Sequence, residues 1–361
     1  MTIHIAQIAP LTEAVPPKMY GGTERVVHWL TEELVALGHQ VTLYATGDSR
    51  TSARLEAPWP RALRLDPSVR DPNALHMMML EQVRRQAHEF DILHFHLDYY
   101  PFSLFSRQRT PFVTTLHGRL DLPEHQPLFR TFSTMPVISI SNAQRRPVPH
   151  AGWVRTIHHG LPEKLLTPQP VKPSYLAFLG RIAPEKRVDR AIAIARGVGL
   201  PLKIAAKVDR ADREYYEESI KDLIDGTSVE YIGEIADHEK AEFLSGATAL
   251  LVPIDWPEPF GLVMIEAMAC GTPVIAFNRG SVPEIVEEGV TGFIVEDVQD
   301  AIGATYRLPE LSRKAIRAAF EKRFTARRMA QDYLAVYREL REPTPHLKLV
   351  KAAHPAVADR A

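Results

Sequence analysis

The feature that most constrains the fold of this chain is an alternation of short apolar segments with amphipathic segments, in two runs separated by prolines. Near-continuous apolar segments of this length are typical of buried parallel strands, and the amphipathic segments between them are typical of helices that cover a sheet. In the first run the predicted strands are 3–8, 41–46, 91–97, 111–116, 137–140 and 154–158, and the predicted helices are 23–37 and 74–90. Gly38 suits the end of the first helix.

The second run begins after residues 162–173, which hold four prolines and predict a linker. Its predicted strands are 175–179, 202–206, 229–232, 249–254, 274–277 and 293–295, and its predicted helices are 187–197, 215–224, 238–244, 262–269 and 282–286. Because 361 residues are too many for one ordinary core, we expect two domains. The sequence therefore predicts an α/β protein in which two Rossmann-like, doubly wound parallel-sheet domains face each other across a cleft. The expected parts are an N-terminal domain at 1–165, a C-terminal domain at 172–325, a last helix at 326–341 and a flexible tail at 342–361.

Charge balance and cysteine count limit the partners and the compartment. The net charge is −1, so no basic excess points to nucleic acid or to an anionic membrane as a general partner. Cys270 is the only cysteine, which excludes an internal disulfide and fits a reducing cytoplasm. The first residues lack the features of a secretory signal, and no apolar run reaches the ~18 residues that would span a bilayer. We expect a cytoplasmic protein without transmembrane segments, and peripheral contact with a membrane surface stays open.

Two glutamates eight residues apart, Glu258 and Glu266, are the main local signal for a ligand. Glu258 follows the predicted strand at 249–254, and Glu266 lies inside the predicted helix at 262–269. In a doubly wound sheet such a loop faces the cleft, and the start of the next helix presents free N–H groups that suit phosphate. A carboxylate accepts hydrogen bonds from vicinal hydroxyls, so we expect Glu266 to hold a ribose and Glu258 to hold a second sugar. The alternative is a charged loop followed by a glutamate on a helix surface.

Cations and glycines follow the first predicted strand of each run. Arg181 and Lys186 are expected in the wall of the cleft, where they can neutralise a diphosphate leaving group without a metal ion. Gly21 and Gly22 precede a helix and would let the backbone approach a phosphate from the opposite domain. The structural alternatives for these segments are a solvated basic loop and a plain flexible turn.

Histidines occur at two other predicted strands. His117 follows the strand at 111–116 and is expected to hydrogen-bond a sugar hydroxyl or a reacting oxygen, unless it only caps the strand. His94, His96 and Asp98 share one face of a strand and suit a metal, an acceptor or packing, but no second cluster completes a metal site. The sequence contains no Asp-x-Asp, the pattern with which many sugar transferases hold Mg²⁺ or Mn²⁺. We therefore expect no bound metal.

The segments EPFGLVMIE and GRIAPEKR resemble the retaining glycosyltransferases of family 4, which share the two-domain GT-B fold. GGTERVV, TLHG, SISNAQRR and ACGTPVIAFNRGSVPEIVEEGVTGFIV fall in that family's order, so the resemblance covers nearly the whole chain. It implies that Arg181 and Lys186 bind the donor diphosphate, that Glu258 contacts the donor sugar and Glu266 the ribose, and that His117 lies near the reaction centre. The resemblance also implies contacts to phosphate and sugar from Pro259, Phe260, Gly261 and Leu262.

The resemblance has further implications for mechanism and for other parts of the chain. The family transfers with retention, requires no metal or other cofactor, and usually ends in a helix that crosses back to the N-terminal domain, which suits 326–341. Many members have a glycine-rich turn where this chain has 205–212, and Lys207 there is expected to add a phosphate contact. On the acceptor side we expect contacts from His96, Asp98, Tyr99 and Asp121.

Together, these observations predict a retaining hexosyltransferase. It is expected to move a hexose from a nucleoside-diphosphate sugar, with UDP-glucose as the expected donor, to a hydroxyl of a sugar or small-molecule acceptor. Nothing in the sequence identifies an enzymatic nucleophile, so we expect the acceptor to attack from the leaving-group face while a donor phosphate oxygen takes its proton. The alternatives are a nucleotide-sugar epimerase or a phosphorylase on the same fold and, from another class, a two-domain sugar-binding protein without turnover.

Overall fold

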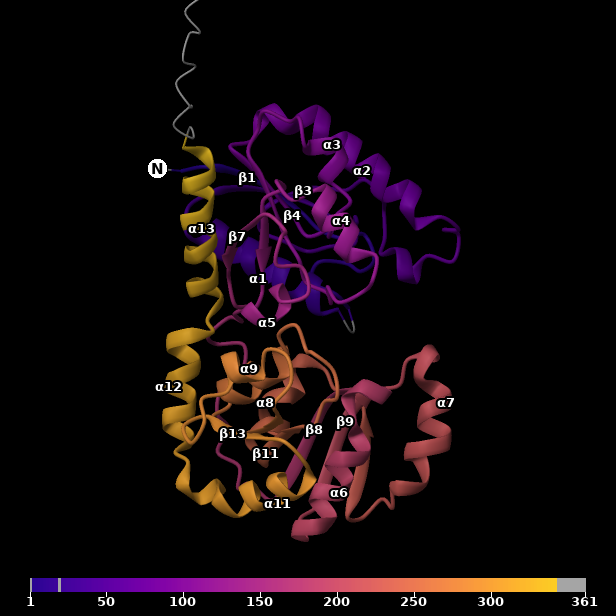
Figure 1. Ribbon diagram of the computed structural model, residues 1–361, viewed down its shortest axis with the longest axis vertical. Coiled ribbons are helices and arrows are strands. Elements are labelled where there is room, and N and C mark those ends of the chain that lie inside the picture. The colour runs from indigo at the N-terminus through magenta and orange to yellow at the C-terminus, as the bar shows by residue number, and fades with distance from the viewer. Residues whose placement is uncertain (1, 19–20, 343–361) are drawn as a thin grey trace, which may run out of the picture.

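The computed structural model describes residues 2–18 and 21–342 and contains two parallel sheets, each accompanied by helices (Figure 1). The first sheet has the order β3-β2-β1-β4-β5-β6-β7, with β1 (His4–Ile8), β2 (Gln40–Tyr44), β3 (Arg54–Glu56), β4 (Ile92–Phe95), β5 (Phe112–Thr115), β6 (Val137–Ser139) and β7 (Trp153–Thr156). The second has the order β10-β9-β8-β11-β12-β13, with β8 (Tyr175–Arg181), β9 (Leu202–Lys207), β10 (Val229–Gly233), β11 (Ala247–Val252), β12 (Val274–Phe277) and β13 (Gly292–Val295). All neighbouring strands pair in parallel, which confirms the predicted α/β class.

Helices lie in most of the connections between successive strands, as parallel pairing requires, and α11 to α13 follow the last strand. The N-terminal domain contains α1 (Gly22–Ala36), α2 (Pro72–Gln86), α3 (Phe102–Phe105), α4 (His125–Thr131) and α5 (Asn142–Arg145). The remaining helices are α6 (Val188–Val198), α7 (Arg213–Tyr215), α8 (Asp237–Ser245), α9 (Leu262–Ala269), α10 (Val282–Ile285), α11 (Val298–Arg307), α12 (Arg313–Arg323) and α13 (Ala326–Arg341). In α1 the fully buried Leu30 and Leu34 lie four residues apart on one face, and Gly38 (φ 85°) follows the helix.

Strand order reverses beside the first strand of each sheet. β1 lies between β2 and β4, and β8 lies between β9 and β11. At such a point the two loops that leave the carboxyl ends of neighbouring strands turn to opposite faces of the sheet, and the crevice between them is where doubly wound proteins bind ligands. The fold therefore provides one such crevice in each domain.

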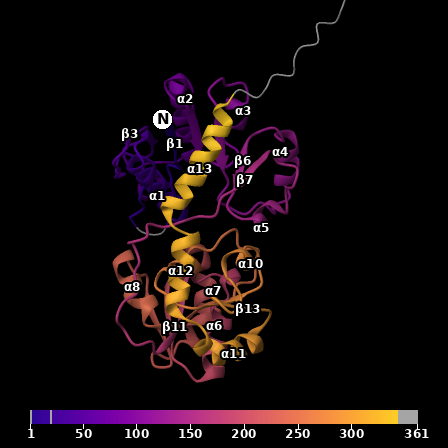
Figure 2. The same ribbon diagram turned by 90° about the vertical axis from the view of Figure 1, so that its left-hand side faces the viewer.

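Two crossing segments connect the domains. The N–H of Leu161 donates to the carbonyl of Phe324 (3.0 Å), and the N–H of Ala326 donates to the carbonyl of Leu161 (2.8 Å). Gly160 permits this approach, because a Cβ at this position would lie 2.2 Å from the carbonyl oxygen of Thr325. The chain then continues into α13, which packs against α1 of the N-terminal domain (Figure 2). The preceding helix, α12, packs against α9 of the C-terminal domain (Figure 1).

The predicted strands are all present, with ends that differ by two residues or fewer. The short edge strand β3 and the helices α3, α4, α5, α11 and α12 were not predicted. The buried side chains of α11 are only Ala301, Ala304 and Thr305, and those of α12 are only Ile316 and Phe320. The predicted helix at 215–224 is instead α7 followed by a π-helical turn (Tyr216–Ile220) and a 3₁₀ turn (Lys221–Leu223). Residues 343–361 of the predicted tail lie outside the described residues. In the described part of the chain, no helix has the length and apolar character needed to cross a membrane.

Candidate active site

A pocket of about 380 Å³ lies between the two domains, at the carboxyl ends of strands from both sheets. The N-terminal domain contributes the start of α1 and the loop after β5, and the C-terminal domain contributes the ends of β8 and β9 and the segment from β11 into α9. The structure thus brings together every residue predicted for catalysis or donor binding: Gly21, Gly22, His117, Arg181, Lys186, Lys207, Glu258, Pro259, Phe260, Gly261, Leu262 and Glu266.

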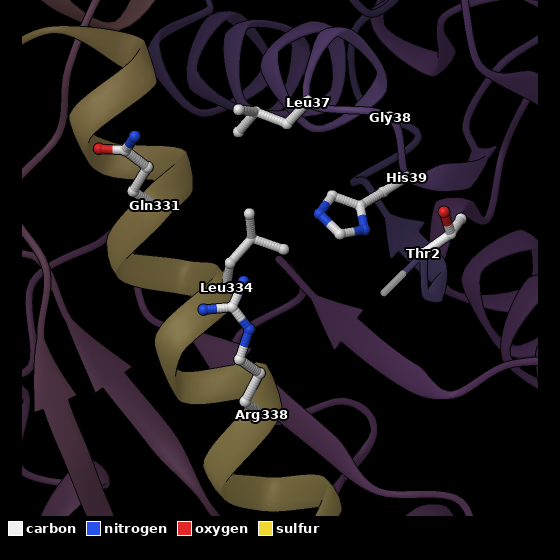
Figure 3. A pocket seen from close by; sticks show the side chains of 7 residues that line it. All are labelled: Thr2, Leu37, Gly38, His39, Gln331, Leu334 and Arg338. Atoms are coloured by element: carbon white, nitrogen blue, oxygen red, sulfur yellow. The ribbon is translucent and has the colours of Figure 1, made fainter.

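A larger hollow of about 500 Å³ lies elsewhere, between α13 and the loop that joins α1 to β2 (Figure 3). Its lining consists of Thr2, Leu37, Gly38, His39, Gln331, Leu334 and Arg338. The N-terminal half of this lining precedes β1 and β2, so the hollow lies at the amino ends of these strands, away from the crevice. Since doubly wound sheets bind ligands at the carboxyl ends of their strands, we assign the candidate site to the smaller, interdomain pocket.

Two helix N-termini from different domains meet at this pocket. α1 follows Gly21 and α9 follows Gly261, and neither glycine has a side chain that could cap the first N–H groups. A Cβ at Gly22 would lie 3.7 Å from Cδ1 of Leu262, so the two helix starts face each other closely. Gly261 has a φ of 82°, which favours glycine. Both positive helix ends therefore point at one volume, an arrangement that suits an anion.

Arg181 and Lys207 end the neighbouring strands β8 and β9, and both are surrounded by carboxylates that the sequence analysis did not single out. Arg181 lies 2.5 Å from Glu185 and 3.5 Å from Asp212, and Lys207 lies 2.8 Å from Asp209. Burial raises the pKa of Asp212, whose Oδ2 accepts no hydrogen bond within the described part of the chain. The cations are thereby held in place at the strand ends, although their charge is partly compensated.

Glu258 is held by an ion pair and by the loop around it. Its Oε2 contacts the ammonium of Lys186 and accepts a hydrogen bond from Nε1 of Trp256 (2.9 Å), and the ammonium lies 4.8 Å from the centre of the Trp256 ring. Gly280 (φ 56°) packs on the backbone of the same loop, where a Cβ would lie 2.3 Å from the amide nitrogen of Glu258. Ser281 adds two hydrogen bonds, from its N–H to the carbonyl of Glu258 (3.0 Å) and from its hydroxyl to the carbonyl of Phe260 (2.8 Å). The segment after β12 therefore sets the position of Glu258.

Glu266 lies one turn inside α9 and is buried. Its Oε1 accepts a hydrogen bond from Nζ of Lys240 (2.7 Å), a buried lysine of α8. Lys240 is also 3.2 Å from Asp237, which pairs with Arg25 of α1. A chain of alternating charges thus connects Glu266 to the opposite domain, and sequence reasoning missed all of its members except Glu266.

His117 leaves the end of β5 and lines the pocket. Its Nε2 lies 2.8 Å from Nδ1 of His96, and its ring stacks on His159 with ring centres 5.3 Å apart. Burial lowers the pKa of His117 to about 3, so the ring is neutral at physiological pH. His159 also lines the pocket and was not predicted as a site residue.

The residues expected on the acceptor side lie outside the described lining of the pocket, which does not include His96, Asp98, Tyr99 or Asp121. His96 is buried behind His117, whereas Asp98 (φ 46°) and Tyr99 are exposed in the loop after β4, and Asp121 accepts two hydrogen bonds from Arg119 (2.7 and 2.8 Å). Their predicted contact with an acceptor stays a prediction.

The buried histidines of β4 are engaged in hydrogen bonds. His94 bonds to the hydroxyls of Tyr337 (2.6 Å) and Thr115 (2.7 Å), which favours packing over metal ligation for this residue. Across residues 2–18 and 21–342, no three His, Cys, Asp or Glu side chains are arranged to hold a metal ion.

Glu284 of α10 forms hydrogen bonds that connect the two domains. Its carboxylate accepts hydrogen bonds from the N–H groups of Asn142 and Ala143 (both 2.7 Å) at the start of α5, and it lies 3.2 Å from Nε2 of His158. Burial alone would raise the pKa of Glu284, but the bonds from His158, Asn142 and Ala143 outweigh it and hold the pKa at about 2. A carboxylate of one domain therefore caps a short helix of the other.

Comparison with known proteins places these features in a family. The family model for Glycosyltransferase Family 4 matches residues 20–199, and the model for Glycosyl transferases group 1 matches residues 167–322. The alpha-maltose-1-phosphate synthase of Mycolicibacterium smegmatis is 25% identical over 84% of this chain and 88% of its own length. The glycogen synthase of Mycobacterium tuberculosis is 31% identical, over 51% of this chain and 48% of its own length.

A solved structure shares the whole architecture. The Anabaena protein HepE, crystallised with UDP and glucose, aligns with a TM-score of 0.71 at 19% identity and covers 93% of this chain and 99% of its own. The two parallel sheets, the pocket between them and the two consecutive family matches agree. The chain belongs to the group 1 glycosyltransferases and has the GT-B fold.

Proposed function

We propose that this glycosyltransferase moves a hexosyl group from UDP-glucose to a hydroxyl of a sugar or small-molecule acceptor, with retention and without a metal ion. The observation that carries the proposal is that several groups converge in one pocket. They are the uncapped starts of α1 and α9, the cations Arg181, Lys186 and Lys207, and the carboxylates Glu258 and Glu266. These groups match the parts of a nucleotide sugar, since helix ends and cations suit a diphosphate and carboxylates suit the hydroxyls of ribose and hexose. HepE, which is described with UDP and glucose, supports this choice of donor.

The diphosphate is assigned to Arg181, Lys186 and the starts of α1 and α9. When the bond between the hexose and the diphosphate breaks, negative charge grows on the leaving group. Groups that are already fixed near that charge stabilise the transition state more than the bound substrate. Arg181 is held by Glu185 and Asp212 before any ligand binds, so no large reorganisation is needed. These fixed positive groups would stabilise the negative charge that a metal ion stabilises in other transferases.

The carboxylates are assigned to the two sugars. Oε1 of Glu266 accepts from Lys240, which leaves Oε2 to accept from the ribose hydroxyls. Glu258 faces the same pocket from the loop before α9 and is assigned to the hydroxyls of the hexose. Its oxygen Oε2 is engaged by Lys186 and Trp256, which suits a role in binding better than attack on the anomeric carbon.

The proposed reaction proceeds on one face of the sugar. The acceptor oxygen forms a bond to the anomeric carbon on the side from which the diphosphate departs, and the acceptor proton passes to a phosphate oxygen of the leaving group. The configuration at the anomeric carbon is then retained. His117 lines the pocket, where it can hydrogen-bond the hexose. Because its low pKa keeps the ring neutral, His117 has no extra proton to donate as a general acid.

Thermal unfolding with UDP, GDP, ADP and NAD, each at about 100 times Kd where known, tests the donor site. A bound nucleotide then adds about 2.7 kcal/mol, a shift of several degrees. We expect a shift with UDP that Arg181→Ala abolishes, and Arg181→Ala should lower kcat by about 10²–10³. An unchanged rate would remove Arg181 from this role.

Product analysis by NMR separates the competing activities. A transferase releases UDP and forms an α-linked product only when an acceptor is present. Turnover without an acceptor would indicate an epimerase, turnover that requires inorganic phosphate would indicate a phosphorylase, and binding without any product would indicate a sugar-binding protein.

A further inference from the structure

A buried chain of hydrogen bonds runs from the C-terminal helix to the pocket. Tyr337 of α13 accepts a hydrogen bond from Nε2 of Gln7 (3.0 Å), and Oε1 of Gln7 lies 2.8 Å from Nε2 of His96. Nδ1 of His96 lies 2.8 Å from Nε2 of His117. Tyr337 and Gln7 are completely buried, and His96 is 3% exposed, so water does not compete for these bonds.

The direction of each bond follows from the donor inventory of the groups. Because Gln7 uses its amide N–H on Tyr337, its carbonyl oxygen accepts from His96, and Nε2 of His96 carries the proton. A neutral imidazole has one N–H, so Nδ1 of His96 is an acceptor, and it accepts from Nε2 of His117. Nδ1 of His117 then holds a lone pair.

Neutral rings and an unused atom support this order. Burial lowers the pKa of His96 well below its ordinary value and the pKa of His117 to about 3, so neither ring gains a second proton at neutral pH. Nδ1 of His117 is buried and has no hydrogen-bond partner in the described part of the chain. A buried acceptor without a donor is unfavourable, and a hydrogen bond from a ligand hydroxyl would remove this cost.

We propose that Gln7 and Tyr337 are positioning residues that fix His117 as the tautomer with a bare Nδ1, so that this buried atom of a pocket-lining side chain is an acceptor for a hydroxyl of the donor hexose. The inference rests on the proposed function for the identity of the ligand, but the tautomer itself does not depend on it. Since Tyr337 belongs to α13, the last helix of the described chain determines the hydrogen-bonding character of a histidine in the donor pocket.

Histidine-selective ¹⁵N labelling tests the tautomer directly. Long-range ¹H–¹⁵N correlation spectra of the whole protein should show His117 protonated at Nε2 and bare at Nδ1, with assignment by His117→Asn. In Tyr337→Phe, the resonances should move toward a mixture of the two tautomers. Protonation of Nδ1 in the unaltered protein would overturn the proposal, whether or not Tyr337→Phe folds.

Kinetics with a matched control test the consequence. Tyr333 lies on the same helix, is equally buried and bonds to Thr115 (3.0 Å). Its hydrogen bonds reach Tyr337 through Thr115 and His94, and it is not a member of the path from Tyr337 to His117. Tyr337→Phe should lower kcat/KM roughly three- to tenfold, the value of one hydrogen bond, whereas Tyr333→Phe should stay within about twofold. Equal losses in the two variants would show a merely structural role and overturn the proposal. Absence of any transfer in the unaltered protein would refute the proposed function while the spectra still decide the tautomer.

Discussion

Replacing Lys240 with methionine tests the pair that holds Glu266. The two side chains are 9% and 4% exposed, and their charged atoms are 2.7 Å apart. At an effective dielectric constant of about 20 this separation corresponds to about 6 kcal/mol of gross attraction, most of which offsets the cost of removing both charges from water. Methionine preserves the length of the apolar stem but leaves the carboxylate of Glu266 buried without its cation.

Removal of one partner of a buried pair destabilises a protein by about 3–5 kcal/mol. We therefore expect Lys240→Met to lower the free energy of unfolding by about 3 kcal/mol, which lowers the melting temperature of a chain this long by roughly 4 °C. Lys221→Met is the matched control, because Lys221 forms a pair of the same 2.7 Å length with Glu217 on the surface, where both side chains are exposed. Loss of that exposed pair should leave the stability nearly unchanged, because water and salt screen it.

A second substitution distinguishes lost charge from lost packing. In Lys240→Met/Glu266→Gln the uncompensated carboxylate is gone, so we expect the double variant to be more stable than Lys240→Met, as urea unfolding would show. If Lys240→Met lowers the free energy of unfolding no more than Lys221→Met does, or if adding Glu266→Gln restores no stability, the buried pair does not stabilise the fold. For activity, Lys240→Met should raise the donor KM more than it lowers kcat.

Three further perturbations test neighbouring parts of the site. Glu258→Gln should strengthen binding of UDP, since Lys186 loses its competing carboxylate, and weaken binding of UDP-glucose; calorimetry measures both. Gly280→Ala should cost about 2–4 kcal/mol in urea unfolding, because the new Cβ meets the backbone of Glu258 and the φ of 56° is strained; a neutral effect would contradict this. The pKa of Glu284 is about 2 in the folded protein, so the protein should be more stable than Glu284→Gln, by at most about 3 kcal/mol, above pH ~4.5. That advantage should vanish as the pH falls from about 4.5 to about 2, and a difference independent of pH would refute it.

The fold was predictable because its main signal is local. Parallel strands that are buried on both faces appear in the sequence as apolar segments, and the linker appears as a cluster of prolines. β3 and α12 were not predicted because their apolar pattern is weak. β3 is a three-residue edge strand without a buried residue, and α12 buries only two of its side chains. Elements whose stability comes from the neighbours they contact leave little periodicity in their own residues.

The candidate site was predictable where position along the strand determines position in space. Arg181 ends one strand and Glu258 follows the carboxyl end of another, and the topology of a doubly wound sheet brings such positions together. No such rule applies to Lys240 and Glu284. Lys240 belongs to a helix with the sequence DHEKAEFLS, in which charged residues occur on more than one face, so the sequence does not show that Lys240 will be buried. Only the packing of α8 on α9 brings its ammonium to Glu266. Tertiary contacts of this kind are not encoded in local spacing.

The charge pairs in the pocket affect how a donor would bind. Lys186 pairs with Glu258, and Arg181 pairs with Glu185, so each cation assigned to the diphosphate already has a carboxylate partner. A diphosphate that draws Lys186 away leaves Glu258 without its cation, and this cost is removed only if hydroxyl groups donate to the freed carboxylate. On the proposed assignment, phosphate and hexose binding are coupled through a single ion pair, and we expect a nucleotide sugar to gain more from the exchange than a bare nucleotide. After transfer the hexose would no longer compensate Glu258, and we expect the return of Lys186 to this carboxylate to favour release of the nucleoside diphosphate.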